Sequence, residues 1–263
     1  MKSYYTQLRI DELKYGLPWL PLSLKMLFTG YLLAIGLGLL VAGAQIMLTH
    51  GMADGKFGLS VDDIVYSYYG NREGTTIEAK LNGTMKDKAP PEIRIELIKW
   101  ARKGAPQKDW DNGIHQKIQD HCVLCHNQSS FLPDFTKLET LQSLAKADTG
   151  ESVAKLTAVS HIHLFGISFI FMLMGLIFVF SIGIPQWLKA VIVMIPFLFL
   201  ILDILSWWLT KYFPGFAWVT IIGGFGYTFA STAMWCISLY QLWILPKILT
   251  KSPPPYTPPA EES

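Results

Sequence analysis

The chain has 263 residues, of which 51% are apolar and only 16% are charged, and its formal net charge is +2 at pH 7. Low charge and a positive mean hydropathy favour a membrane protein over a water-soluble globular one. The small net charge gives no support for binding to nucleic acid.

Four apolar stretches are long enough to cross a hydrocarbon core of about 30 Å, which takes roughly 20 helical residues. They run near residues 24–48, 162–184, 188–209 and 218–245. Only the third carries a charge well inside it, at Asp203. Ala42-Gly43-Ala44 resembles a signal-peptide cleavage site, but the long apolar stretch and its long leader favour a retained anchor.

Basic residues near the helix ends indicate the orientation. Lys2, Arg9, Lys14 and Lys25 precede the first stretch, Lys189 lies between the second and third, Lys247 and Lys251 follow the fourth, and the remaining short loop has only Lys211. By the positive-inside rule, we expect both termini in the cytoplasm of a bacterium and the segment after the first stretch in the periplasm. The protein is therefore predicted to be a multi-pass protein of the inner membrane.

The expected organisation has four parts. Residues 1–49 form the cytoplasmic N-terminus and first transmembrane helix, residues 50–158 a periplasmic domain, residues 159–247 transmembrane helices two to four, and residues 248–263 a Pro-rich cytoplasmic tail without a core. The periplasmic segment has 14 Lys and Arg against 15 Asp and Glu, a balance of −1. Its charge does not indicate steering of a strongly charged partner.

Two helices are predicted in the second half of the periplasmic segment. Pro90-Pro91 opens a pattern that Gly104 closes, and its apolar face consists of Ile93, Leu97, Trp100 and Ala101. A second, shorter helix places Ile114 and Ile118 one turn apart and leads directly into Cys122.

The run Cys122-Val123-Leu124-Cys125-His126 has the C-x-x-C-H pattern of a covalent haem c attachment site. Two thiols one helical turn apart meet the two vinyl groups on one edge of a porphyrin, and the adjacent imidazole reaches the iron. A redox dithiol or half of a zinc site would need a thioredoxin-like context or a second ligand pair. The remaining thiol, Cys236, lies in an apolar stretch and is interpreted as a buried thiol.

Residues 121–126 resemble the attachment segment of the c-type cytochromes, and the resemblance extends over about a hundred residues. It implies one-electron transfer by one covalent haem c, with attachment on the periplasmic side and His126 on the iron. In the common small fold of this family, the motif comes first, and a Met ligand with a final helix comes last. Here Gly83-Thr84-Met85 and the helix from Glu92 to Lys103 come first, which resembles a circular permutation.

The swapped order implies Met85 as the sixth iron ligand. Two alternatives remain: Met85 is an ordinary packing residue, or His161 reaches the haem c iron instead.

Ionisable residues gather at the expected periplasmic interface, where such groups are functional candidates. They are His50, His161, His163 and Asp203. Three interpretations compete: polar residues that cap helices, a quinone site in which a His and Asp203 take protons from quinol, or a b-type haem held between His50 and one of the other two histidines. Residues two apart on a helix point roughly 200° apart, so only one of His161 and His163 could face a given iron.

The fourth apolar stretch also contains Gly223-Gly224 and Gly226, which permit close helix approach. Trp187, Trp207, Trp208, Trp218 and Trp243 lie near helix ends, as expected for an interfacial belt.

We therefore expect a mainly α-helical protein, with four transmembrane helices and a small α-helical periplasmic cytochrome c domain. The expected function is that of a monohaem subunit passing electrons between the quinol pool, or a quinol-oxidising partner, and a periplasmic acceptor within a larger respiratory or photosynthetic complex. Expected partners are membrane lipid, other subunits of that complex and a periplasmic electron donor or acceptor. Such a subunit is part of an oxidoreductase rather than a complete enzyme. The alternatives are a structural subunit with a non-essential haem and a haem-based sensor.

Overall fold

The structure, a computed structural model, describes residues 16–130 and 132–249, and these are mainly helical. Within these ranges no strand forms, and an isolated antiparallel bridge pairs Thr75 with Ala147. The expectation of a mainly α protein is confirmed. The basic residues Lys2, Arg9, Lys14 and Lys251 and the tail from Ser252 lie outside the described residues.

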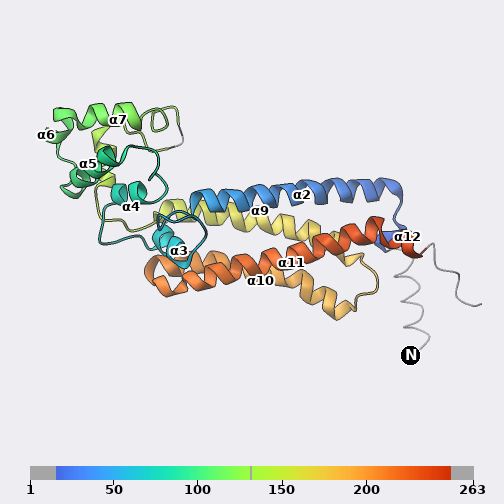
Figure 1. Ribbon diagram of the computed structural model, residues 1–263. Helices are drawn as coiled ribbons and strands as arrows, with labels where there is room; N and C mark the ends of the chain where they lie inside the picture. Colours follow the sequence, from blue (N-terminus) through green and yellow to red (C-terminus); the bar gives the residue numbers. More distant parts are fainter. Residues whose placement is uncertain (1–15, 131, 250–263) are drawn as a thin grey trace, which may run out of the picture. The chain divides into compact units, whose positions relative to one another are not determined.

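The helices follow one another as Figure 1 shows. In chain order they are η1 (Leu17–Trp19), α2 (Leu22–Thr49), α3 (Val61–Tyr68), α4 (Thr76–Asn82), α5 (Pro91–Arg102), α6 (Gln107–Asp109), the π-turn η2 (Trp110–Ile114), α7 (His115–His121), α8 (Leu138–Leu144), α9 (Val153–Val179), α10 (Gln186–Tyr212), η3 (Pro214–Phe216), α11 (Ala217–Trp243) and α12 (Leu245–Leu249).

Three of these helices, α2, α9 and α10, are long and apolar enough to cross a membrane. Helix α9 begins at Val153, well before the apolar run predicted from residue 162, because the Ser152 hydroxyl caps it by accepting a hydrogen bond from Lys155 N (3.2 Å). Helix α11 is equally long and has no charged residue, but its Gly, Ser, Thr and aromatic residues lower its hydropathy.

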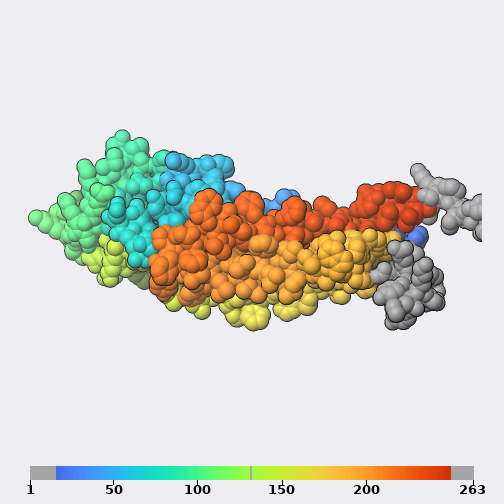
Figure 2. All heavy atoms as spheres, turned by 90° about the horizontal axis from the view of Figure 1, so that it is seen from below, coloured from blue at the N-terminus to red at the C-terminus, as the bar shows by residue number. Residues whose placement is uncertain are grey.

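Contacts divide the chain into two compact units, of which the first comprises residues 1–39, 163–201 and 224–263. Trp235 Nε1 of α11 donates a hydrogen bond to the Leu32 carbonyl of α2 (2.7 Å), and Tyr31 Oη of α2 donates to a carbonyl of α9 (3.0 Å). Helices α10 and α11 approach at Gly226, where a Cβ would lie 2.5 Å from the Phe199 ring. Atoms of these two helices, orange in Figure 2, lie directly against each other.

The second unit comprises residues 40–162 and 202–223. An apolar cluster from α4, α5, α7 and α8 forms its core. The buried members are Leu81, Leu97, Trp100, Ala101, Ala105, Trp110, Ile114, Ile118, Leu138, Leu141 and Ala145. The predicted face of α5 is confirmed, with Ile93 packed at its edge, and Gly104 ends the helix region with φ +82°. Helix α5 and helix α7, the two helices whose order in the chain is swapped relative to the common cytochrome c fold, therefore share one core.

Helices α3, α4 and α8 of this unit were not predicted, and local capping explains α3 and α4. Ser60 and Asp63 form a capping box at the start of α3, and the Thr75 hydroxyl accepts a hydrogen bond from Glu78 N at the start of α4. Helix α8 has no side-chain cap and forms by packing Leu138 and Leu141 into the apolar cluster. Each helix is too short for periodicity to reveal it.

Two glycines allow two segments of the second unit to cross. A Cβ on Gly70 (φ +86°) would lie 2.3 Å from the backbone nitrogen of Gly150, and a Cβ on Gly150 (φ +68°) would lie 2.2 Å from the carbonyl oxygen of Tyr68. Next to the crossing, the Asp148 carboxylate accepts a hydrogen bond from Asn71 N (2.9 Å). This crossing fixes the end of α3 beside the residues that precede α9.

One side-chain prediction is wrong. Cys236 is exposed rather than buried, because its position on α11 points away from the neighbouring described helices. The glycine prediction is confirmed at Gly223 and Gly226, since a Cβ at either position would collide with α10, but Gly224 has only the Tyr227 hydroxyl near it, at 3.9 Å.

Replacing Gly70 with Ala should destabilise the protein far more than replacing Gly104 with Ala. Both glycines have φ above +80°, so both variants lose roughly 1–3 kcal/mol to backbone strain. Only Gly70→Ala adds a collision with backbone, whereas nothing lies within 4 Å of a Cβ at Gly104. Thermal unfolding in detergent measures the difference. Equal losses in the two variants would show that the crossing is not tightly packed.

Candidate functional site

The C-x-x-C-H motif lies at the end of α7, in the second unit. Cys122 follows the last helical residue, and the chain continues in a helical turn, in which His126 N donates to the Cys122 carbonyl (2.9 Å). Cys122 is half-buried against the apolar cluster, whereas Cys125 is exposed, and both are free thiols. Leu124, between them, is 89% exposed. Burial raises the pKa of the Cys122 thiol, which is therefore protonated at neutral pH.

The His126 imidazole is held by a backbone carbonyl. Its Nδ1 atom lies 3.1 Å from the Pro133 oxygen. A carbonyl oxygen only accepts, so Nδ1 carries the proton, and in a neutral ring Nε2 is the nitrogen with a lone pair for a metal. Metal-binding histidines characteristically donate their second nitrogen in this way. The ring also stacks on Phe135, with centroids 4.0 Å apart and planes inclined by 7°.

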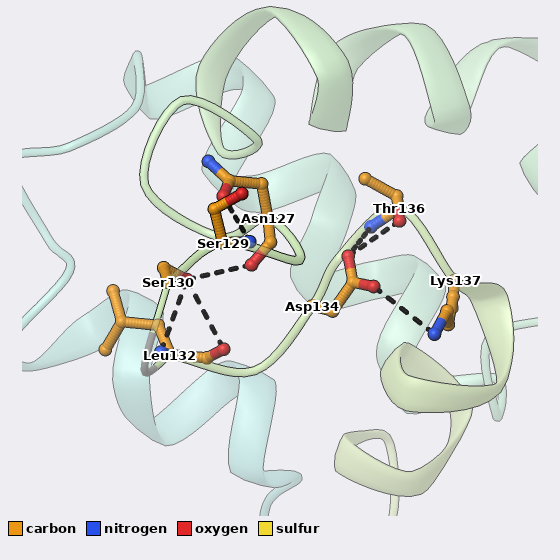
Figure 3. A network of polar contacts seen from close by, with 7 residues as sticks. All are labelled: Asn127, Ser129, Ser130, Leu132, Asp134, Thr136 and Lys137. Atoms are coloured by element: carbon orange, nitrogen blue, oxygen red, sulfur yellow. Dashed lines mark hydrogen bonds and ion pairs between the residues drawn. The ribbon is translucent and has the colours of Figure 1, made fainter.

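A polar network orders the loop that carries the Pro133 carbonyl (Figure 3). The Asp134 carboxylate accepts hydrogen bonds from the backbone nitrogen (3.0 Å) and the hydroxyl (2.6 Å) of Thr136 and lies 3.6 Å from Lys137 Nζ. At the other end, the Asn127 amide donates to the Val123 carbonyl (3.0 Å). The loop is thus tied both to the motif and to the start of α8.

Met85 lies in the turn after α4, where its backbone nitrogen donates to the Lys80 carbonyl (2.8 Å). Its side chain is half-buried and packs against the apolar cluster that Cys122 and Phe135 also contact. The fold therefore brings Met85 to the same core as the motif. Its role as an iron ligand stays a prediction.

A small cavity of about 90 Å³ lies in the second unit beside His50. Its lining residues come from four parts of the chain and are His50, Tyr68, Glu151, Lys155, Leu156, Val159 and Trp207. His50 Nδ1 is 2.9 Å from the Ser67 hydroxyl. The Tyr68 ring stacks on two other rings. Its centroid lies 6.3 Å from that of His50, with the ring planes inclined by 23°, and 5.7 Å from that of Trp207, with the planes inclined by 12°.

Asp203 adjoins this stack. Its Oδ1 atom accepts a hydrogen bond from Trp207 Nε1 (3.0 Å), and the residue is only 4% exposed. Helix α11 closes over it at Gly223, where a Cβ would lie 2.8 Å from Asp203 Cβ. The structure thus connects His50 with Asp203 through Tyr68 and Trp207.

The other two histidines of the predicted cluster are placed differently. His161 is exposed on α9, and His163 belongs to the first compact unit. Neither lines the cavity beside His50. The structure therefore brings only His50 and Asp203 to the same stack of rings. The common depth of the four residues in a membrane and a direct role for His161 or His163 stay predictions.

Several residues of both sites were not predicted. The Pro133 carbonyl is a backbone group with no sequence signature, although Pro133-Asp134 seven residues after the motif is a turn signal. Tyr68 and Ser67 lie in a helix too short to be recognised, and Glu151 and Lys155 resemble ordinary surface charges in the sequence.

Comparison with known proteins gives one match. A family model described as a transmembrane helical domain matches residues 141–249, which contain α9, α10 and α11. No curated protein and no solved structure matches the chain. With the three apolar helices, this match supports a transmembrane protein.

His50 should contribute stability that is lost as the pH drops below about 6.5, the ordinary pKa of His. Burial away from water lowers the pKa of His50, an effect that Glu151 and Asp63 oppose and Lys80 and Lys155 reinforce. Between the lowered pKa and 6.5, His50 therefore binds fewer protons in the folded protein than in the unfolded chain, and its contribution favours unfolding in acid. Melting temperatures between pH 7.5 and 5 should fall less in His50→Gln than in wild type.

The exposed His115 provides the control for this measurement. His115→Gln should follow the wild-type pH profile. A His50→Gln profile that coincides with wild type would contradict a buried neutral imidazole at this position.

Proposed function

We propose that the protein is a membrane-anchored monohaem cytochrome c that passes electrons between the quinol pool, or a quinol-oxidising partner, and a periplasmic acceptor within a larger complex. The observation that carries this proposal is the hydrogen bond from His126 Nδ1 to the Pro133 carbonyl at 3.1 Å. A redox dithiol does not need an imidazole whose Nδ1 donates to a carbonyl. A histidine ligand of a metal characteristically makes this hydrogen bond, because it fixes the tautomer and the ring orientation.

The donor set fits a covalent haem. Cys122 and Cys125 would hold it through thioethers, and His126 Nε2 would be one axial ligand of the iron. Val123 and Phe135 offer apolar contact next to Cys122, as partly buried members of the same cluster. Bound there, the haem would supply reversible one-electron transfer.

Met85 is proposed as the second axial ligand. Its support is the shared core: Met85 and Cys122 pack against one apolar cluster, although 37 residues separate them in the chain. Helices α5 and α7 meet in that cluster, as a permuted arrangement of the family's terminal helices requires.

The proposed membrane arrangement has four spans, with α11 as the fourth. At a rise of 1.5 Å per residue, its 27 residues extend about 40 Å, which exceeds a hydrocarbon core. The basic residues of the sequence then favour cytoplasmic termini and a periplasmic segment of residues 50–158 in a bacterial inner membrane. The periplasm is the side on which haem c is attached.

The experiment that tests the proposal replaces the two thiols. Cys122→Ala with Cys125→Ala should lose all covalently bound haem after expression with a cytochrome c maturation system, because no thioether can form. Cys236→Ala is the matched control and should keep it. Peroxidase staining of denatured protein on a gel measures covalent haem. Haem that stays covalently bound in the double variant would refute attachment at these cysteines.

Met85→Ala should keep the covalent haem but lose the weak red absorption band that methionine sulfur gives to ferric haem. The reduction potential should also fall, because a thioether stabilises the ferrous state. A wild-type spectrum typical of two histidine ligands would contradict the assignment of Met85 and favour His161 or His163.

A further inference from the structure

The cavity beside His50 lies where membrane helices end. His50 directly follows α2, Leu156 and Val159 lie in the first turns of α9, and Trp207 lies near the end of α10. All of these residues belong to the second unit. A ligand here would have its polar end among these groups and any long tail along the membrane helices. The site therefore favours an amphiphile.

The walls of the cavity favour a flat ligand. Tyr68 and Trp207 are inclined by only 12°, and His50 and Tyr68 by 23°, so three rings form a nearly parallel stack on one side. Leu156 and Val159 supply apolar contact from α9. The cavity volume is about 90 Å³, whereas a pocket that encloses a whole drug-sized ligand has a volume of roughly several hundred Å³. It suits the edge of one planar ring.

The charges of the lining favour a neutral ligand. Lys155 Nζ donates to the Glu151 carboxylate at 2.6 Å, so the two charges cancel. Burial lowers the pKa of His50, which is therefore neutral at pH 7. An anionic phosphate would find no unpaired positive charge among the lining residues.

Nδ1 of His50, which lines the cavity, is held by a side chain. The Ser67 hydroxyl holds Nδ1 at 2.9 Å, and this fixes the ring and leaves Nε2 for another partner. On the opposite side of the stack, the bond from Trp207 Nε1 to Asp203 fixes the indole. Both outer rings of the stack are thus positioned by their own hydrogen bonds.

We propose that this cavity binds the headgroup of a membrane quinone or quinol, with one headgroup oxygen hydrogen-bonded to His50 and its ring beside Tyr68 and Trp207. This inference deepens the proposed function, on which its biological meaning rests: the chain itself, rather than a partner subunit, makes contact with the quinol pool. Quinones are neutral, planar and amphiphilic, as the walls, charges and position of the cavity require.

The test measures binding of decylubiquinone, and of a short-chain menaquinone in a parallel arm, to the full chain in phosphatidylcholine nanodiscs. Wild type should bind one of the two saturably, with one molecule per chain. His50→Leu removes the hydrogen bond and should weaken binding about tenfold. Val159→Phe fills the cavity from α9 and should weaken it at least as much. His115→Leu, at a residue that does not line the cavity, should bind as wild type does.

Each outcome decides the inference. No saturable binding to wild type, or wild-type affinity in both His50→Leu and Val159→Phe, overturns it. Displacement of the quinone by anionic phosphatidylglycerol would identify a phospholipid site instead and also overturns it. If His50→Leu fails to fold, Ser67→Ala, which frees the imidazole, should weaken binding severalfold. Covalent haem is assayed on the same samples, so loss of haem and loss of quinone binding are scored separately.

Discussion

The hydrogen bond between His126 and the Pro133 carbonyl is the interaction on which the functional account depends. It places the proton on Nδ1 and leaves Nε2 with the lone pair, which the proposed function assigns to the haem iron. Polar contacts order the chain on both sides of Pro133: Asn127, Ser129, Ser130 and Leu132 form one group, and Asp134, Thr136 and Lys137 form another (Figure 3). The loop between the motif and α8 therefore orients the His126 ring through the Pro133 carbonyl, although the proposal assigns no iron ligand to the loop.

Close approaches between backbone segments position the residues around the cavity beside His50. The crossing of Gly70 and Gly150 sets the end of α3 against the residues before α9, and Gly223 lets α11 close over Asp203. Tyr68 and Glu151, beside the first crossing, both line the cavity. Glycine at these positions allows residues far apart in sequence to gather around His50. The side chains of His50, Tyr68, Trp207 and Asp203 are thereby hydrogen-bonded or stacked.

The sequence predicted the features that depend on local pattern. The apolar runs form helices, and the predicted apolar face of α5 lies in the core of the second unit. It did not predict the stack, because Tyr68 lies in a two-turn helix without a clear period. It also could not reveal the Pro133 carbonyl, a backbone acceptor. Depth alone does not fix the direction of a side chain around a helix, so His161 and His163 do not line the cavity, and Cys236 is exposed.

Whether this chain carries one covalent haem can be measured with a pyridine haemochrome spectrum of the full-length wild-type protein purified from bacterial membranes. We expect one haem per chain, with the absorption of a haem whose vinyl groups are saturated by two thioethers. A chain without haem, or with haem whose vinyl groups are intact and which organic solvent extracts, would contradict it.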